Sequence, residues 1–158
     1  MAQLVSTLLA IPLAAASLLY FLWAAGLNLP FANEQALARS IIGRRGITRG
    51  PSRRTFAYLG VLLLAAAAAA FFLGGFSEQV PRSKPFLAPV GLLLALVFLG
   101  RGIAGILPAF ERAAPEQPYL TLNRRIYSPL CALAGLGFLF LTIALPNWTW
   151  RLSQLFGG

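Results

Sequence analysis

Apolar residues gather in four long stretches of the chain, and most charged residues lie between them. The stretches that predict membrane-spanning helices cover residues 4–27, 55–74, 86–107 and 128–146. A helix needs about 20 apolar residues to cross the hydrocarbon core of a bilayer. The fourth stretch is near the lower limit, because Ser128 and Pro129 are expected to begin its helix as N-cap and first helical position. The pattern predicts an all-α integral membrane protein, a bundle of four helices that forms one domain over residues 1–158.

Composition supports this fold class and excludes a soluble one. Hydrophobic residues make up 58% of the chain and charged residues 11%, and the mean hydropathy is +0.75. A soluble domain carries about 25% charged residues. The first stretch has a competing interpretation as a signal peptide, because Ala14–Ala16 resemble a cleavage site. No basic segment precedes it, which favours a retained first helix.

The residue types that the chain lacks limit the metal sites and catalytic groups that it can form. The chain has no histidine and no aspartate, four glutamates and one cysteine. The missing histidines therefore exclude histidine-ligated haem, histidine zinc sites and Ser-His-Asp or Cys-His nucleophiles. We expect no catalytic residues, no metal site and no cofactor, and we expect a protein that is not an enzyme.

The charge distribution predicts an orientation. The net charge is +9, and nine of the cations fall in the first and third predicted loops: Arg39, Arg44, Arg45, Arg49, Arg53, Arg54, Arg112, Arg124 and Arg125. Three fall in the second loop and the tail: Arg82, Lys84 and Arg151. Because loops rich in Lys and Arg stay in the cytoplasm, both termini are predicted on the non-cytoplasmic side.

The basic loops are expected to meet anionic lipid. Nucleic acid is not an expected partner, since no separate soluble domain exists to bind it. The glycine- and arginine-rich run 43–50 lacks the Gly-Lys-Ser/Thr ending of a phosphate loop, so a solvated basic loop is favoured. Before it, Asn33–Gln35 and the apolar residues that follow favour a short helix in the interface. The candidate contacts for lipid headgroups or an acidic partner in this loop are Arg44, Arg45, Arg53 and Arg54.

Arg101 is the only residue inside a predicted span that is charged at neutral pH. An arginine at a bilayer centre costs about 2.5–3.5 kcal/mol on the insertion scale. Arg101 lies six residues before the end of its span, so its side chain can reach the interface. We expect it to snorkel to a lipid phosphate. The alternative is an inward orientation that binds backbone carbonyls, an anionic headgroup or a ligand.

Small residues form a second pattern. Ala88, Ala95 and Gly102 recur every seven residues in the third stretch, and Cys131 and Gly135 are four apart in the fourth. Such faces let helices approach closely. Packing within the chain is the favoured use, and partner binding is the alternative.

Three segments carry a resemblance to a known family. Residues 20–26, 98–103 and 123–131 resemble a bacterial family of four-helix membrane proteins, the domain-of-unknown-function family 3995. The most specific part is the run from Tyr127 to Cys131. The resemblance implies a small protein of the bacterial inner membrane without an established activity.

The chain also departs from that family. The resemblance implies a histidine where this chain has Tyr20, and acids where it has Gly105 and Asn123. A shared catalytic role is therefore not expected here. Arg101 and Tyr127 are retained, which fits a preserved scaffold.

Two functions from different classes follow from these observations. The favoured one is a non-enzymatic accessory or scaffold subunit of a larger complex of integral membrane proteins. The alternative is a pocket between helices that binds or modifies a lipid or isoprenoid-like molecule. A transporter is disfavoured, because no acid lies within a span. The polar groups of such a pocket are Tyr20, Trp23, Asn28, Arg101 and Tyr127. The candidate contacts for lipid headgroups or a partner at this end of the spans are Arg101, Arg124, Arg125 and Tyr127.

Overall fold

The computed structural model describes residues 1–28, 31, 33–42, 46, 51–75, 86–113, 115 and 119–144. The regular structure of these residues is entirely helical. Its elements are α1 (Ala2–Ala24), α2 (Glu34–Ile41), α3 (Arg53–Leu73), α4 (Leu87–Ala104), α5 (Pro108–Ala113), α6 (Tyr119–Leu122), a π-helical turn (Asn123–Tyr127) and α7 (Ser128–Ile143).

Four helical segments are long and apolar enough to cross a membrane. They are Ala2–Ala24, Arg53–Leu73, Leu87–Ala104 and Tyr119–Ile143. The predicted all-helical class with four apolar helices is therefore confirmed. The predicted end of the fourth span at residue 146 lies outside the described residues.

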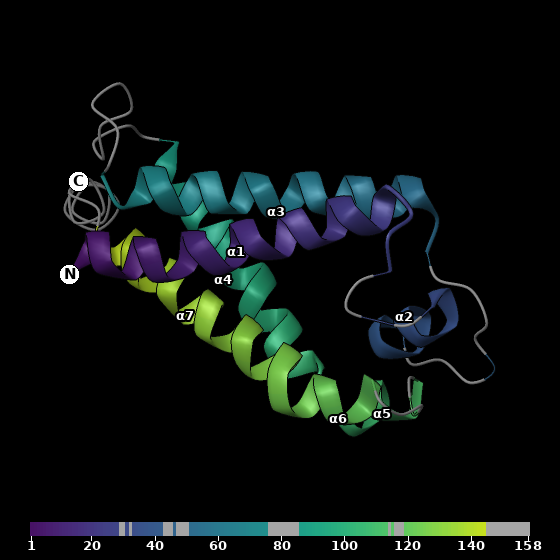
Figure 1. The fold of residues 1–158 in the computed structure, drawn as a ribbon. Helices are drawn as coiled ribbons and strands as arrows, with labels where there is room; N and C mark the ends of the chain where they lie inside the picture. Colours follow the sequence, from purple (N-terminus) through teal and green to yellow (C-terminus); the bar gives the residue numbers. More distant parts are fainter. Residues whose placement is uncertain are drawn as a thin grey trace.

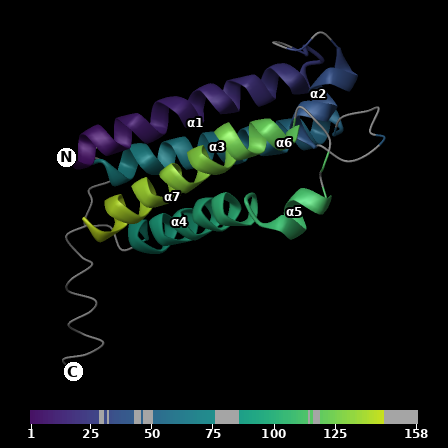
Figure 2. The same ribbon diagram turned by 90° about the horizontal axis from the view of Figure 1, so that it is seen from below.

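The long helices form two pairs, α1 with α3 and α4 with α7, and most contacts between helices lie within these pairs. The pairs lie close together at the end where the chain begins and separate towards the end that carries α2, α5 and α6 (Figure 1). Figure 2 shows the same short helices gathered at that end. The largest group of buried apolar residues joins the two pairs: Leu9, Leu13, Ala66, Ala67, Ala70, Leu73, Leu87, Ala88, Ala95, Phe138 and Leu141.

Two buried serines fix α1 against α3. Ser6 Oγ donates to the carbonyl of Ala70 at 2.6 Å, and Ser17 Oγ donates to the carbonyl of Gly60 at 2.7 Å. Hydrogen bonds between helices in a membrane are worth about 0.6–2 kcal/mol each. The two bonds set the register of this pair at two levels.

Glycines let α4 and α7 approach closely. A Cβ atom at Gly102 would lie 2.8 Å from the backbone nitrogen of Ala132, and one at Gly135 would lie 2.6 Å from the backbone nitrogen of Leu99. Only glycine fits where backbones meet at this distance. The small residues of the third predicted span that are buried are Ala88, Gly91, Ala95 and Gly102. This face is therefore used for packing within the chain, in agreement with the favoured interpretation of the small residues.

The fourth spanning helix differs from the prediction at its start. Ser128 is helical, with φ −68° and ψ −46°, and its N–H donates to the carbonyl of Asn123 in a π-helical turn. The expectation that Ser128 caps a new helix is therefore wrong. Pro129 has no N–H and its ring would meet the carbonyl of Arg125 in a regular helix, and the wider π turn relieves that conflict. The helix consequently runs from Tyr119 to Ile143 and is longer than expected.

The short helix expected in the first loop is present as α2. Asn33 is its N-cap, and its side chain accepts a hydrogen bond from the Ala36 N–H at 2.8 Å. Leu37 of α2 is buried with Trp23 of α1 and Phe56 of α3. On its other side α2 contacts α6. The helix therefore links the two pairs at the end where they separate.

Candidate functional site

Arg101 lies in the last turn of α4, and its guanidinium group contacts residues from three other elements. Its Nη2 donates to the hydroxyl of Tyr119 at 3.2 Å and to Oδ1 of Asn123 at 3.0 Å. The ring of Phe110 in α5 lies over the guanidinium, with its centroid 4.9 Å from Cζ. These contacts place the positive charge inside the protein. The snorkelling expectation is therefore wrong, and the inward orientation is the observed one.

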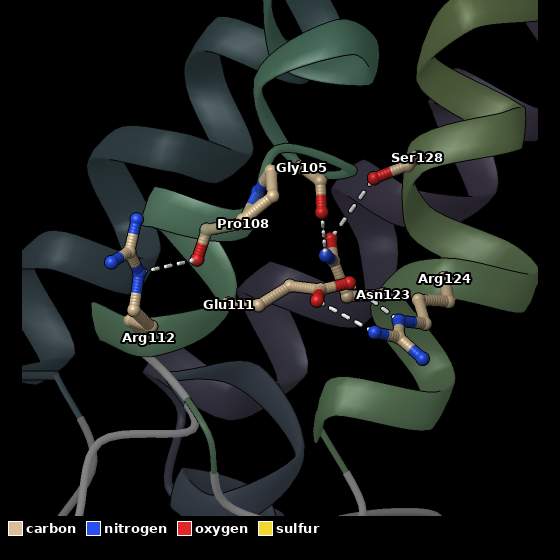
Figure 3. Close-up of polar contacts among 7 residues, drawn as sticks. All are labelled: Gly105, Pro108, Glu111, Arg112, Asn123, Arg124 and Ser128. Atoms are coloured by element: carbon tan, nitrogen blue, oxygen red, sulfur yellow. Dashed lines mark hydrogen bonds and ion pairs between the residues drawn. The ribbon is translucent and has the colours of Figure 1, made fainter.

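Asn123 is the centre of the hydrogen-bond network and is fully buried. Its Nδ2 donates to the carbonyl of Gly105 at 2.6 Å, and its Oδ1 accepts from Arg101 and from Ser128 Oγ at 3.1 Å. Figure 3 shows its amide between Gly105 and Ser128. The two donors and the one carbonyl fix which end of the amide is oxygen. The π turn brings Asn123 and Ser128, five residues apart, to one side of the helix.

Gly105 follows α4, and its lack of a side chain lets Arg101, Asn123 and Ser128 approach one another. A Cβ atom there would lie 2.5 Å from Arg101 Nη1 and 3.0 Å from Asn123 Oδ1, and it would overlap Ser128 Oγ. The backbone of Gly105 has an ordinary helical φ of −64°, so glycine is required here for space and not for conformation. We call Arg101, Gly105, Tyr119, Asn123 and Ser128 the Arg101 cluster.

One guanidinium nitrogen of the cluster has no partner. Arg101 Nη1 is buried, and it makes no hydrogen bond to any residue that the structure describes. The ion pair found among these residues joins Glu111 to Arg124 and leaves Arg101 without a carboxylate. A buried donor without an acceptor costs about 1–3 kcal/mol, and more when it is charged. Among the described residues, the cluster therefore lacks a counter-charge for Arg101 and an acceptor for its Nη1.

A short helix covers the cluster and is held by the Glu111–Arg124 pair. Glu111 follows Phe110 in α5, and Arg124 donates to its two carboxylate oxygens at 2.5 Å and 2.6 Å (Figure 3). The hydrogen bond from Arg124 holds the pKa of the Glu111 carboxyl below its usual value. The contribution of the pair to stability is therefore complete above the usual glutamate pKa and is lost as the pH falls through the lowered one.

Three of the other candidate residues are aromatic and are held by contacts within the protein. Tyr127 donates to the carbonyl of Ser40 at 3.0 Å and so ties the π turn to α2. Tyr20 packs on Trp23, with 4.9 Å between ring centroids, and on Phe56, with 6.0 Å between ring centroids. Trp23 is only 7% exposed, so it belongs to the packed interior.

The remaining candidates lie away from the cluster. The Asn28 carbonyl accepts a turn hydrogen bond from the Phe31 N–H at 2.7 Å, and no described contact joins Asn28 to Arg101. Arg53, Arg54 and Arg125 are exposed, and Arg44 and Arg45 lie outside the described residues.

Two of the three positions at which the chain departs from the resembled family lie together. Gly105 and Asn123 lie beside the Arg101 side chain, and no described contact joins Tyr20 to it. Sequence reasoning did not assign a site role to Tyr119, Phe110 or Ser128. The one sequence signal for these residues was an arginine inside a span, because such a charge requires polar neighbours. The sequence does not show which residues of the following loop supply them.

A groove of 490 Å³ lies beside the cluster, between α2 and α6. Leu122, which precedes Asn123, forms one side of it, and Ser40, which accepts from Tyr127, forms another. Its lining residues are Phe31, Asn33, Gln35, Ala36, Arg39, Ser40 and Leu122. The groove and the cluster therefore share one end of the bundle.

The fold and the cluster define a multi-pass helical membrane protein with a polar site at one end of its bundle. The chain belongs to the family described as Protein of unknown function (DUF3995), whose model matches residues 13–138. The resemblance stated from the sequence is thereby confirmed. Comparison with curated proteins and with solved structures found no match.

Proposed function

We propose that this is a non-enzymatic membrane protein that binds a lipid-like amphiphile through the Arg101 cluster. The buried, unpartnered Nη1 of Arg101 carries the proposal. Charged residues within membrane spans are costly and rare, and they commonly mark functional sites. A ligand that brings an acceptor to this nitrogen would recover the cost of burying it.

Native mass spectrometry tests the proposal. We expect the wild-type protein, released from a mild detergent after extraction, to keep a bound amphiphile that Arg101→Gln loses. Arg125→Gln is the matched control, because it removes the same charge from an exposed position in the π-helical turn that carries Asn123. Equal adducts on all three proteins, or none on any, would reject the proposal.

A role as an accessory or scaffold subunit is the second candidate. In the apolar windows of the spans only 22–33% of residues are buried within the chain, so most of each helix faces outward. The small residues of α4 no longer support this role, since α7 covers them. The outward surfaces and the exposed arginines remain as contacts for other integral membrane proteins.

The accessory role predicts migration with a larger complex in native extracts. Exchanging Arg44, Arg45, Arg53 and Arg54 for glutamine should loosen the complex and reduce its salt sensitivity, because surface ion pairs are screened by salt. The measurement is native electrophoresis followed by crosslinking. Migration as a lone protein without crosslinked partners would end this candidate.

We propose a location in the bacterial inner membrane, with both termini on the non-cytoplasmic side. The positive-inside rule supports this orientation. In a Cys131→Ser background, Ser52→Cys should resist an impermeant maleimide in intact spheroplasts, and Ser77→Cys should react. Ser77 lies outside the described residues. The reverse labelling pattern would overturn the orientation.

A further inference from the structure

The Arg101 cluster has more hydrogen-bond donors than acceptors. Asn123 Oδ1 already accepts two bonds, and its amide nitrogen is used by the Gly105 carbonyl. The Tyr119 hydroxyl accepts from Arg101, so its own proton is left without a described acceptor. Arg101 Nη1 is the second donor in this position. The group that completes the cluster must therefore be an acceptor.

The cluster also carries a positive charge without a counter-charge. Phe110 offers the face of its ring to the guanidinium, which stabilises a cation but does not neutralise it. Arg101 as a whole is half-buried, but its Nη1 atom is buried, and the neighbouring Tyr119 and Asn123 are 4% and 0% exposed, so water screens the charge only in part. A buried charge is normally paired. The missing acceptor is therefore expected to be an anion.

The geometry limits how that anion is held. Arg101 Nη2 already donates to Tyr119 and Asn123, so the parallel pair of bonds that uses both Nη atoms is not free. Of the two Nη atoms only Nη1 remains, and the space beside Gly105 is already filled, because a Cβ atom there would overlap Ser128 Oγ. A bidentate grip through the two Nη atoms is therefore excluded, and a single acid oxygen must approach Nη1 from another side.

We propose that the Arg101 cluster binds the single acid group of an amphiphile, with one anionic oxygen accepting from Arg101 Nη1 and from the Tyr119 hydroxyl. This rests on the proposed function and names its ligand class. A carboxylate and a phosphodiester share the required chemistry. A neutral glycerolipid or an uncharged isoprenoid quinone does not.

Access to Nη1 requires movement, and α5 is the element that covers it. Phe110 overlies the guanidinium, while none of the residues of α5 is fully buried. The ion pair that holds α5 involves a side chain that is 57% exposed, Arg124, and one that is 20% exposed, Glu111. Exposed ion pairs are weak. The structure therefore assigns to α5 the role of a cap that is displaced when the acid group binds.

The ligand class is tested by thermal stability in an uncharged detergent. Oleate, phosphatidylglycerol, monoolein and inorganic phosphate are the probes. We expect oleate or phosphatidylglycerol to raise the melting temperature, and monoolein and phosphate to have no effect. Oleate alone would identify a carboxylate, and phosphatidylglycerol alone a phosphodiester; an effect of free phosphate equal to theirs would refute the need for an amphiphile.

Tyr119→Phe makes the test specific, because it removes one proposed donor and keeps the ring. We expect it to weaken acid binding on the order of tenfold, the usual effect of one hydrogen bond to a charged group. Binding that is unchanged in Tyr119→Phe, or monoolein binding as tight as oleate binding, would overturn the ligand class while leaving amphiphile binding intact. If no amphiphile binds the wild-type protein, the proposed function itself fails.

The cap is tested by tethering it. In a Cys131→Ser background, Glu111→Cys and Arg124→Cys together should be joined by a short bis-maleimide, and the joined protein should lose acid binding. Each single cysteine variant, treated with the same reagent, is the control and should still bind the acid, because it breaks the ion pair but cannot tether the cap. Acid binding that survives tethering would overturn the role of α5 and would leave the ligand class standing.

Discussion

Gly102→Ala is expected to destabilise the protein by about 1–3 kcal/mol, the usual cost of forcing a methyl group into a filled core. The added Cβ would lie 2.8 Å from the backbone nitrogen of Ala132 and 3.0 Å from its Cα. Backbone atoms cannot rotate away as a side chain can, so α4 and α7 must separate. The free energy of unfolding in mixed micelles measures the loss.

Gly100→Ala is the matched control for this prediction. Gly100 lies on the same helix two residues earlier, and a Cβ there would meet nothing within 4 Å. Because alanine is a better helix former than glycine, this variant should be neutral or slightly stabilising. Equal stabilities for the two variants would show that α4 and α7 do not pack as described.

Replacing Arg101 is expected to have the second large effect. Arg101→Leu should lower the free energy of unfolding by about 2–4 kcal/mol, because it removes two charge-assisted hydrogen bonds and leaves buried partners unsatisfied. Arg101→Lys should lower it by about 1–3 kcal/mol, since an ammonium group cannot replace the planar donor fork. Thermal unfolding in detergent compares them.

Arg125→Leu separates this network effect from simple charge loss. Arg125 is exposed and lies in the same π turn as Asn123, so its removal should change stability little. If Arg101→Leu and Arg101→Lys are both as mild as Arg125→Leu, Arg101 only snorkels to lipid. In that case the hydrogen bonds to Tyr119 and Asn123 contribute nothing.

The spanning helices were predictable because length and hydropathy determine them almost alone. The bilayer demands about 20 apolar residues per helix, and the chain provides such stretches clearly. The start of the fourth helix was not predictable in this way. Pro129 usually marks the first turn of a helix, but here a π turn carries it within a longer helix, because tertiary contacts of Asn123 and Tyr127 hold the preceding residues helical.

The site was predictable only in part. Arg101 stood out as a charge inside a span, and the departures at Gly105 and Asn123 marked positions near it. Whether Arg101 points to lipid or to protein depends on where the segment after α4 folds back. That path is set by Asn123 bonding to the Gly105 carbonyl, a contact across 18 residues that no local pattern reveals. Tyr119 and Phe110 enter the site through the same fold.

We propose that the half-buried Arg101 guanidinium group, with its buried Nη1, receives the acid group of an amphiphile. Nuclear magnetic resonance of the protein, isotope-labelled at its arginine guanidinium nitrogens, tests it most directly. One guanidinium signal, absent from Arg101→Gln, should shift when oleate is added and stay unchanged when monoolein is added. The account would be contradicted if that signal did not shift on addition of oleate, or if the guanidinium signals of all arginines shifted alike.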